Sequence, residues 1–264
     1  KIVTTGCISW QTKHVQIVRA LHNGETRHGI ISEGQVLFYL GDPILGAELG
    51  KESAPLSSVK LLAPVSPGKV VCIGMNYRAH AAEISIDVPD EPLIFFKPIS
   101  AIIGPEDAIV LPRQSDQVEL EVELAIVIGK QAKEVSYDEA KNHIFGFTVG
   151  NDVTARDLQF SDTQWARSKG FDTFCPLGPW IETELDTSSL RLESRINGRS
   201  SQRSKSSDMI TDVYEIVSYV SRNLTLLPGD VILTGSPAGL ARIEAGDQVE
   251  CEITGIGVLH NPVS

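Results

Sequence analysis

Three glutamates occupy alternate positions of one apolar stretch, residues 118–130 (VELEVELAIVIGK). Every second side chain of a β-strand points to the same face, so Glu119, Glu121 and Glu123 would share one face. Further along, the same face becomes apolar, which indicates that the strand enters the interior on both sides. A buried carboxylate needs a proton, a cation or a metal ion, because an unpaired buried charge is very costly. Neighbouring carboxylates favour a divalent ion with hard oxygen ligands, since the ion relieves their mutual repulsion.

A second alternating stretch near the end of the chain provides a comparison. Glu250 and Glu252 also alternate with apolar residues, but their face leads into Thr254 instead of continuing with apolar side chains. We interpret that stretch as an ordinary solvated strand face. The contrast singles out Glu121 and Glu123, for which a solvated face or a ladder of ion pairs is the alternative interpretation.

His80 and Glu83 are candidates for proton transfer. They lie three residues apart in the segment 75–83, so one or two helical turns would place them on the same face. A glutamate that orients a histidine makes a proton-transfer pair that works near neutral pH. The alternative is a plain surface contact between the two side chains.

Asp152 and Lys169 are two further candidates for the site. Asp152 follows a glycine-containing strand expected over 144–151 and precedes a helix-like segment, so it could cap that helix or complete a metal site. Lys169 is the central cation of 165–180, a stretch rich in Gly, Pro and aromatic residues that shows no helix or strand period. Apolar loops of this kind often line functional sites.

Lys97 and Thr234 are candidates for binding an anionic substrate. Lys97 ends the extended apolar run 91–98, where it could be a surface group or a substrate anchor. Thr234 lies where a buried strand breaks into Thr-Gly-Ser-Pro within 231–239. Hydroxyls and free backbone N–H groups at such a break could hold a carboxylate, or form only a turn.

The remaining pattern predicts a mostly β protein with some helix, an α+β fold with a mixed sheet or roll. Strands are predicted at 69–74 and 190–197, the second closed by the hairpin dipeptide Asn197-Gly198. The polar run that follows Ser200 is expected to be a solvated loop. A capping box predicts a short helix over 136–143, and an apolar stripe of helical period predicts an amphipathic helix over 211–224.

Two domains are expected. Short strand-like runs and turn residues indicate a small N-terminal α/β domain over 1–65. The proline-bounded segment 64–68 separates it from a larger domain over 66–264. The chain has 264 residues, which is enough for a substantial core in the larger domain.

Composition excludes several classes of function. A hydrophobic content of 42% and a charged content of 22% are ordinary for a soluble globular protein. The formal net charge of −11 argues against a nucleic-acid partner, which needs a basic surface. No apolar run approaches the roughly 20 residues of a membrane span, and the first residues show no secretory signal. We expect a cytoplasmic protein with no membrane partner, in which the scattered cysteines are buried free thiols.

Several ordered motifs together resemble the fumarylacetoacetate hydrolase family, in its short prokaryotic-type branch. They span residues 69–261, at 73–83 (IGMNYRAHAAE), 96–98 (FKP), 121–130 (EVELAIVIGK), 151–157 (NDVTARD), 169–179 (KGFDTFCPLGP), 229–237 (GDVILTGSP) and 255–257 (GIG). This resemblance implies a mixed β-roll catalytic domain, usually homodimeric, that binds Mg²⁺ or Mn²⁺. It also implies that the metal ligands are Glu121, Glu123 and Asp152.

The resemblance assigns further roles around that metal. It implies that His80 and Glu83 sit on a lid segment that orders over the substrate, and that Lys169 lies beside the metal. It also implies substrate contacts from Arg156, Gln159 and Thr234. We therefore expect catalytic roles for His80, Glu83 and Lys169, and substrate binding by Lys97 and these three residues.

The leading hypothesis is metal-dependent cleavage of a C–C bond in a small anionic 2-oxo or 2,4-dioxo acid. The ion would act as a Lewis acid on the enolate that forms, and Lys169 would add positive charge. In a hydrolysis of an acylpyruvate, the His80–Glu83 pair would deprotonate the attacking water. In a decarboxylation of oxaloacetate, loss of CO₂ would leave the same enolate.

Two alternatives stay open. The first is an isomerase of a 2-hydroxy-dienoate, of the 2-hydroxyhepta-2,4-diene-1,7-dioate type found in aromatic catabolism. Such an enzyme would form the same enolate without cleaving a C–C bond. A non-catalytic metal-binding dimer is the other alternative, because a fold does not determine a function.

Overall fold

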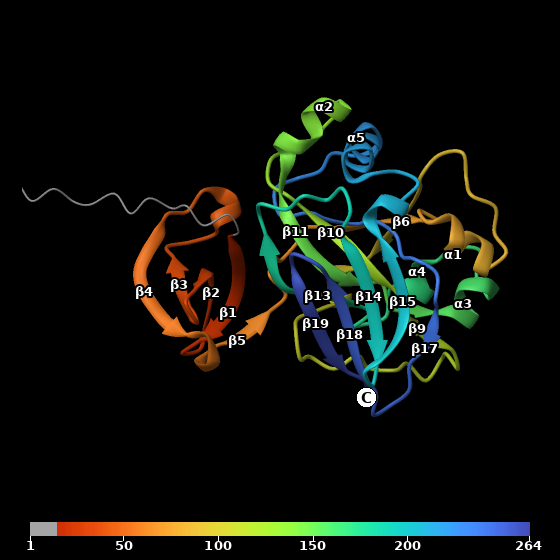
Figure 1. Cartoon of the computed structure of the whole chain (residues 1–264), viewed down its shortest axis with the longest axis horizontal. Helices are drawn as coiled ribbons and strands as arrows, with labels where there is room; N and C mark the ends of the chain where they lie inside the picture. The colour runs from red at the N-terminus through yellow and green to blue at the C-terminus, as the bar shows by residue number, and fades with distance from the viewer. Residues whose placement is uncertain (1–14) are drawn as a thin grey trace, which may run out of the picture.

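Figure 1 shows the computed structural model of the chain, which describes residues 15–264. Its largest sheet has 12 strands, of which ten follow the order β4-β3-β2-β1-β13-β11-β10-β16-β6-β7. The N-terminal strands are β1 (Gln16–His22), β2 (Glu25–Ser32), β3 (Gln35–Tyr39), β4 (Leu49–Pro55) and β5 (Lys60–Leu62). The other strands are β6 (Val70–Gly74), β7 (Leu93–Lys97), β8 (Ile102–Ile103), β10 (Val122–Ile128), β11 (Ile144–Asn151), β13 (Cys175–Glu182) and β16 (Val231–Leu233).

Two smaller sheets and five short helices complete the fold. One sheet has the order β12-β9-β17 and the other β15-β14-β18-β19. Their strands are β9 (Val118–Leu120), β12 (Thr154–Ala155), β17 (Ala241–Arg242), β14 (Arg191–Ile196), β15 (Arg199–Lys205), β18 (Gln248–Ile253) and β19 (Gly257–Pro262). The helices are α1 (Arg78–Glu83), α2 (Tyr137–Ala140), α3 (Arg156–Ser161), α4 (Ala166–Lys169) and α5 (Val213–Asn223). The prediction of a mostly β fold with mixed sheets is confirmed, since parallel pairs (β16 with β6, β13 with β8) occur among antiparallel ones.

The predicted strand over 118–130 lies at the centre of the core. It forms β9 and β10, and every residue of both strands is buried. One face of β10 packs into a cluster with α5, while Ala125 and Val127 on the other face pack against β6, β13 and β16. Burying each large apolar side chain contributes about 1.5–3 kcal/mol, so the strand can carry costly polar groups at its start. The predicted burial on both faces is confirmed.

The comparison strand is confirmed as a solvated face. β18 alternates exposed or half-buried residues with buried ones. Glu250 and Glu252 lie at the surface, where each pairs with Arg195 at 2.7 and 2.8 Å.

Both predicted helices form where expected. Asp212 caps α5 by accepting from the N–H groups of Tyr214 and Glu215, and the apolar stripe of the helix is buried. The predicted capping box opens α2, where Ser136 and Glu139 bond to each other's backbone.

Two predictions of irregular structure are wrong. The polar run after Ser200 is the strand β15, which pairs with β14 along its length. Its polar residues face solvent on one side while Gln202 is fully buried on the other. The second half of 165–180 is the central strand β13. Its prolines argue against a strand, but they are tolerated because its pairing with β11 is irregular.

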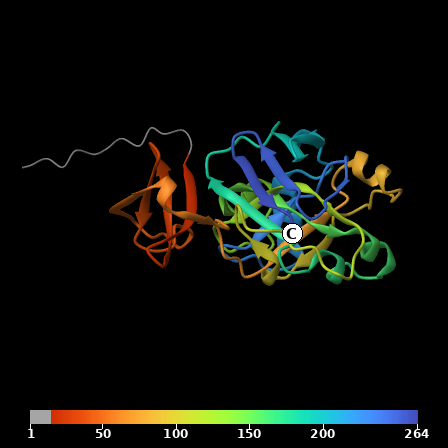
Figure 2. The same cartoon turned by 90° about the horizontal axis from the view of Figure 1, so that it is seen from below.

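The N-terminal strands lie at one end of the molecule in both Figure 1 and Figure 2. They join the main sheet through β1, which pairs with β13 at only two positions, Gln16 with Glu182 and Ile17 with Ile181. They also enclose a small cluster of their own, formed by Val18, Val36, Phe38 and Ala54. A domain boundary near residue 65 stays a prediction.

Two expectations from composition can be compared with the structure. Cys72, Cys175 and Cys251 are buried free thiols as predicted, and Cys7 lies outside the described residues. Among the helices of residues 15–264, none combines the length and the apolar character that crossing a bilayer requires.

Candidate metal and proton-transfer site

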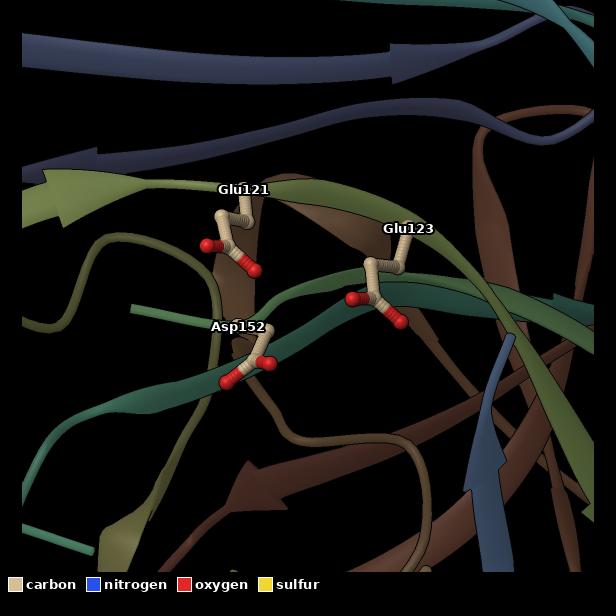
Figure 3. A group of neighbouring side chains, drawn as sticks. All are labelled: Glu121, Glu123 and Asp152. Carbon is tan, nitrogen blue, oxygen red and sulfur yellow. The ribbon is translucent and has the colours of Figure 1, made fainter. Parts of the chain in front are cut away.

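Three buried carboxylates meet where β10 begins and β11 ends (Figure 3). Glu121 lies between β9 and β10, Glu123 lies two residues on, and Asp152 follows β11. Val122 pairs with Asn151 across the two strands, and the Asp152 N–H donates to the Glu121 carbonyl at 2.9 Å. One carboxylate oxygen from each residue lies within 4.8 Å of the other two. None of the three residues is more than 3% exposed.

Lys169 and Arg156 neutralise Glu121 from two sides. Lys169 Nζ donates to Glu121 Oε2 at 3.0 Å and to Asp152 Oδ2 at 2.6 Å. Arg156 donates through Nη2 to Glu121 and through Nε to Glu119, the latter at 2.8 Å. Burial alone would raise the pKa of Glu121, but the charges of Lys169 and Arg156 outweigh this effect and hold that pKa below its usual value. Burial would likewise lower the pKa of Lys169, but the charges of Asp152 and Glu121 hold it above its usual value.

Lys97 forms an ion pair with Asp152. Its Nζ lies 2.7 Å from Asp152 Oδ1 and also donates to the backbone carbonyls of Val153 and Lys169. Among residues 15–264, Oδ1 has no hydrogen-bond donor beyond this ion pair with Lys97. Lys97 is itself only 2% exposed, which rules out the interpretation of a surface group.

Glu123 differs from the other two carboxylates. Its Oε2 accepts from the Gly235 N–H at 2.7 Å, and no cation among residues 15–264 forms an ion pair with it. Burial, followed by the charges of Asp152 and Glu121, raises the pKa of Glu123 well above its usual value. Gly235 approaches closely because it has no side chain: its φ is +101°, and a Cβ would lie 2.6 Å from that of Asn76.

The three carboxylates fit a hard divalent ion. Oxygen donors within a few ångströms of one another, one of them without a cation partner, are the ligands that Mg²⁺ or Mn²⁺ prefers. Four buried carboxylates including Glu119, against Lys97, Arg156 and Lys169, leave one net negative charge. A divalent ion would change this to one net positive charge, which suits an anionic substrate.

His80 and Glu83 form a pair on α1. His80 Nδ1 lies 3.4 Å from Glu83 Oε2, and His80 is only 4% exposed. The Glu83 carboxylate also accepts from the N–H groups of Gly239 and Leu240 at 3.1 and 3.2 Å. Because Glu83 faces Nδ1, Nε2 is the ring nitrogen available to a ligand.

A small pocket joins His80, but not Glu83, to the carboxylates. His80, Lys169 and Gln159 line it together with the three acids. Further lining residues come from segments that the sequence had singled out, namely Ile73, Gly74, Met75, Trp165 and Ser236, whereas Phe95 had not been expected at the site. Phe95 and Trp165 meet edge to face with ring centroids 5.3 Å apart. The pocket offers about 10 Å³ to a water-sized particle, which is roughly the room that one water needs.

The other predicted substrate residues lie around this pocket and do not line it. Arg156 is buried behind Glu121, where its Nη1 also donates to Gln159. Thr234 is fully buried, and its hydroxyl donates to the Leu124 carbonyl at 2.9 Å. Direct substrate contacts by Lys97, Arg156 and Thr234 stay predictions.

The sequence matches a known family over the region that builds the site. The model for the C-terminal domain of fumarylacetoacetate hydrolase matches residues 69–264. The chain belongs to this family. The resemblance expected from the motifs is therefore confirmed, and the fumarylacetoacetate hydrolase fold explains the mixed sheets. A second model, described as Rv2993c-like N-terminal, matches residues 16–64.

Members of the family cover most of the chain. An uncharacterized protein of Methanocaldococcus jannaschii is 53% identical over 75% of this chain and 84% of its own length. The human mitochondrial oxaloacetate tautomerase FAHD2A is 42% identical over 90% of this chain and 80% of its own length. The crystal structure of 5-carboxymethyl-2-hydroxymuconate delta-isomerase from Mycobacterium smegmatis is 45% identical, with a TM-score of 0.88 over 94% of this chain and 98% of that one.

Proposed function

We propose that this chain catalyses proton transfer at the carbon next to the keto group of a small 2-oxo dicarboxylic acid. The reaction is tautomerisation of oxaloacetate or isomerisation of a related 2-hydroxy-dienoate. The observation that carries this proposal is that His80, whose Nδ1 lies 3.4 Å from Glu83, lines the same small pocket as the three carboxylates. Relatives named as an oxaloacetate tautomerase and as an isomerase support the same chemistry.

Glu121, Glu123 and Asp152 would hold a divalent ion, Mg²⁺ or Mn²⁺. When bound, the ion would supply positive charge that attracts the carboxylate and the 2-oxo oxygen of the substrate. Lys97 and Arg156 hold two of the three ligands in place, because they pair with Asp152 and Glu121 from outside the pocket.

His80 takes the proton from C3 of the substrate. Glu83 orients the imidazole and stabilises its charged form, and the N–H groups of Gly239 and Leu240 fix that carboxylate. Lys169 stabilises the negative charge that develops on the 2-oxo oxygen. In a tautomerisation this proton then returns to the 2-oxo oxygen. In the isomerisation of a 2-hydroxy-dienoate the proton instead leaves the 2-hydroxyl group and His80 delivers it to C5, which leaves a 2-oxo group and a double bond between C3 and C4.

C–C bond cleavage is the second candidate. It is favoured by the family match and by the 3.4 Å His80–Glu83 contact, which equally suits a histidine that deprotonates water. Relatives named as an oxaloacetate tautomerase and as an isomerase support proton transfer as the first candidate.

A panel of three substrates tests the proposal. Interconversion of keto and enol oxaloacetate, isomerisation of a 2-hydroxy-dienoate and hydrolysis of an acylpyruvate are followed by ultraviolet absorbance, with Mg²⁺, Mn²⁺ or EDTA. We expect metal-dependent interconversion or isomerisation to exceed hydrolysis. Hydrolysis or decarboxylation as the fastest metal-dependent reaction would favour the second candidate.

A thermal-shift titration with Mn²⁺ and then oxalate examines the non-catalytic alternative. Oxalate resembles the carboxylate and keto oxygens of a 2-oxo acid. A shift with metal but no further shift with oxalate, together with no turnover of any substrate, would contradict the proposal. A homodimer and a cytoplasmic location stay predictions.

A further inference from the structure

Residues 235–240, between β16 and β17, touch both halves of the site. At one end, the Gly235 N–H donates to Glu123 at 2.7 Å. At the other end, the N–H groups of Gly239 and Leu240 donate to Glu83. One short irregular segment thus positions a carboxylate of the metal triad and the carboxylate that orients His80. A residue that holds this segment in place therefore also sets the position of the Glu123 carboxylate relative to that of Glu83.

Gln202, on β15, fixes the first half of the segment. Its side chain is fully buried, and its Nε2 donates to Ser236 Oγ at 2.6 Å and to the Pro237 carbonyl at 2.7 Å. Its Oε1 accepts from the Val122 N–H at 2.9 Å and from Ser194 Oγ at 3.1 Å. Val122 lies between Glu121 and Glu123, so the amide ties the strand that carries these acids to the segment that caps Glu123.

Ser201, the preceding residue on β15, fixes the second half. Its Oγ donates to the Gly239 carbonyl at 2.6 Å. Gly239 lies directly against β15: its φ is +104°, and a Cβ there would lie 2.5 Å from the Ser201 carbonyl oxygen. Two consecutive residues of one strand therefore hold opposite ends of the segment.

We propose that Gln202 and Ser201 are positioning residues of the site: Gln202 sets the place of the metal ligand Glu123, and Ser201 sets the place of Glu83. The inference rests on the proposed function only for the role of Glu83. The part of the proposal that concerns Gln202 and Glu123 predicts an effect on metal binding alone, whatever the reaction. Groups outside the ligand shell typically change metal affinity or activity by about 10–100-fold when they are removed.

The test compares three variants of this network. Gln202→Met keeps the volume of the side chain but removes both donors to the segment. Ser201→Ala removes only the bond to Gly239. Ser194→Ala is the matched control, because Ser194 is fully buried and bonds to Gln202 on the side away from the segment. Mn²⁺ binding is measured by calorimetry without substrate, and kcat is measured against pH with the best substrate of the panel.

We expect Gln202→Met to weaken Mn²⁺ binding by about tenfold. Ser201→Ala should leave Mn²⁺ affinity within about twofold but lower kcat and shift the limb of the pH profile that reports His80, because Glu83 is less well placed. Ser194→Ala should lower the melting temperature without changing either quantity. A role in folding alone would lower the melting temperature of all three and leave Mn²⁺ affinity and the pH profile as in the wild type.

Wild-type Mn²⁺ affinity in a folded Gln202→Met protein would overturn the proposal. If that variant does not fold, Gln202→Glu replaces it, since this change keeps the acceptor for Val122 and loses the donor to Pro237. If neither folds, Ser201→Ala decides, and a wild-type kcat and pH profile overturns the proposal. Weakened Mn²⁺ binding without turnover of any 2-oxo acid would reject the proposed function and leave the role of Gln202 standing.

Discussion

Glu123 is the carboxylate whose environment depends most on a metal ion. Glu121 and Asp152 each have Lys169 and a second cation beside them, whereas Glu123 accepts one backbone hydrogen bond. A buried anion in this position is costly unless it is protonated or bound to a cation. A bound divalent ion would therefore balance the one acid that the protein's own cations leave uncompensated.

Glu123→Gln should abolish tight binding of Mn²⁺, because it removes a charged ligand while keeping the side-chain volume. The fold should survive, since a neutral amide is less costly to bury than an unpaired carboxylate. Calorimetry with Mn²⁺ measures the effect, and Glu250→Gln on the solvated face of β18 is the control. Equal Mn²⁺ affinity in the two variants would show that the three acids are not the metal site.

His80→Ala should lower kcat for proton transfer by about 10²–10⁴-fold, the range typical of a lost general base. Mn²⁺ affinity should stay the same, since His80 is not among the three ligands. His260→Ala is a matched control, because His260 also pairs with a glutamate, Glu106, at 2.9 Å but lies at the surface. Full activity in the His80 variant would exclude it as the base.

Sequence reasoning reached some of these residues and missed others for physical reasons. Alternation within one strand is a local signal, so Glu121 and Glu123 could be found from the sequence. Asp152 joins them only through the pairing of β10 with β11, which no local pattern reveals, and it was identified through the family resemblance. Gln202 was missed because a polar side chain without periodicity carries no sign of the face it occupies, and Trp165 was found only as part of the 165–180 stretch.

At the scale of elements, the strongly periodic segments were predicted well. The apolar stripe of α5 and the two-sided burial of β10 are repeated signals that depend on nearby residues. β13 and β15 were not predicted, because each owes its strand conformation to its neighbours in a sheet. β13 contains two prolines and β15 is mostly polar, so local propensity opposes both assignments.

Asp212→Ala should destabilise the protein by about 1 kcal/mol through loss of the cap of α5. The carboxylate accepts from two backbone N–H groups that would otherwise lack partners in the helix. Thermal unfolding should show a melting temperature lower by about 2–4 °C. Glu215→Ala, in the same first turn but half-buried and with no capping bond from its side chain, should change stability by less than about 0.5 kcal/mol. Equal effects of the two substitutions would contradict the capping role.

At the scale of the whole molecule, metal binding and folding are linked. The three ligands come from segments about 30 residues apart, joined through β10 and β11 at the centre of the core. A ligand that binds only the folded state stabilises it by about 2.7 kcal/mol at a concentration 100 times its Kd. If the site binds a metal ion, we therefore expect it to contribute to the stability of the fold that forms it.

Removal of metal with EDTA should therefore lower the melting temperature of the wild-type protein, and added Mg²⁺ or Mn²⁺ should restore it. The Glu123→Gln variant should respond little to either treatment, because it lacks one ligand. Differential scanning calorimetry at fixed protein concentration measures both. A wild-type melting temperature that does not depend on metal would indicate that the three acids bind none tightly.

The N-terminal strands end the large sheet at the opposite side of the molecule from α1 and α3 (Figures 1 and 2). No residue of β1 to β5 lines the pocket, and the β2–β3 turn at Glu33 and Gly34 is exposed. A short affinity tag or a fluorescent label inserted at this turn would sit far from α1 and α3. Such a handle would let the enzyme be immobilised on a sensor surface for the metal titrations described above, with its reactive end directed toward the flowing solution.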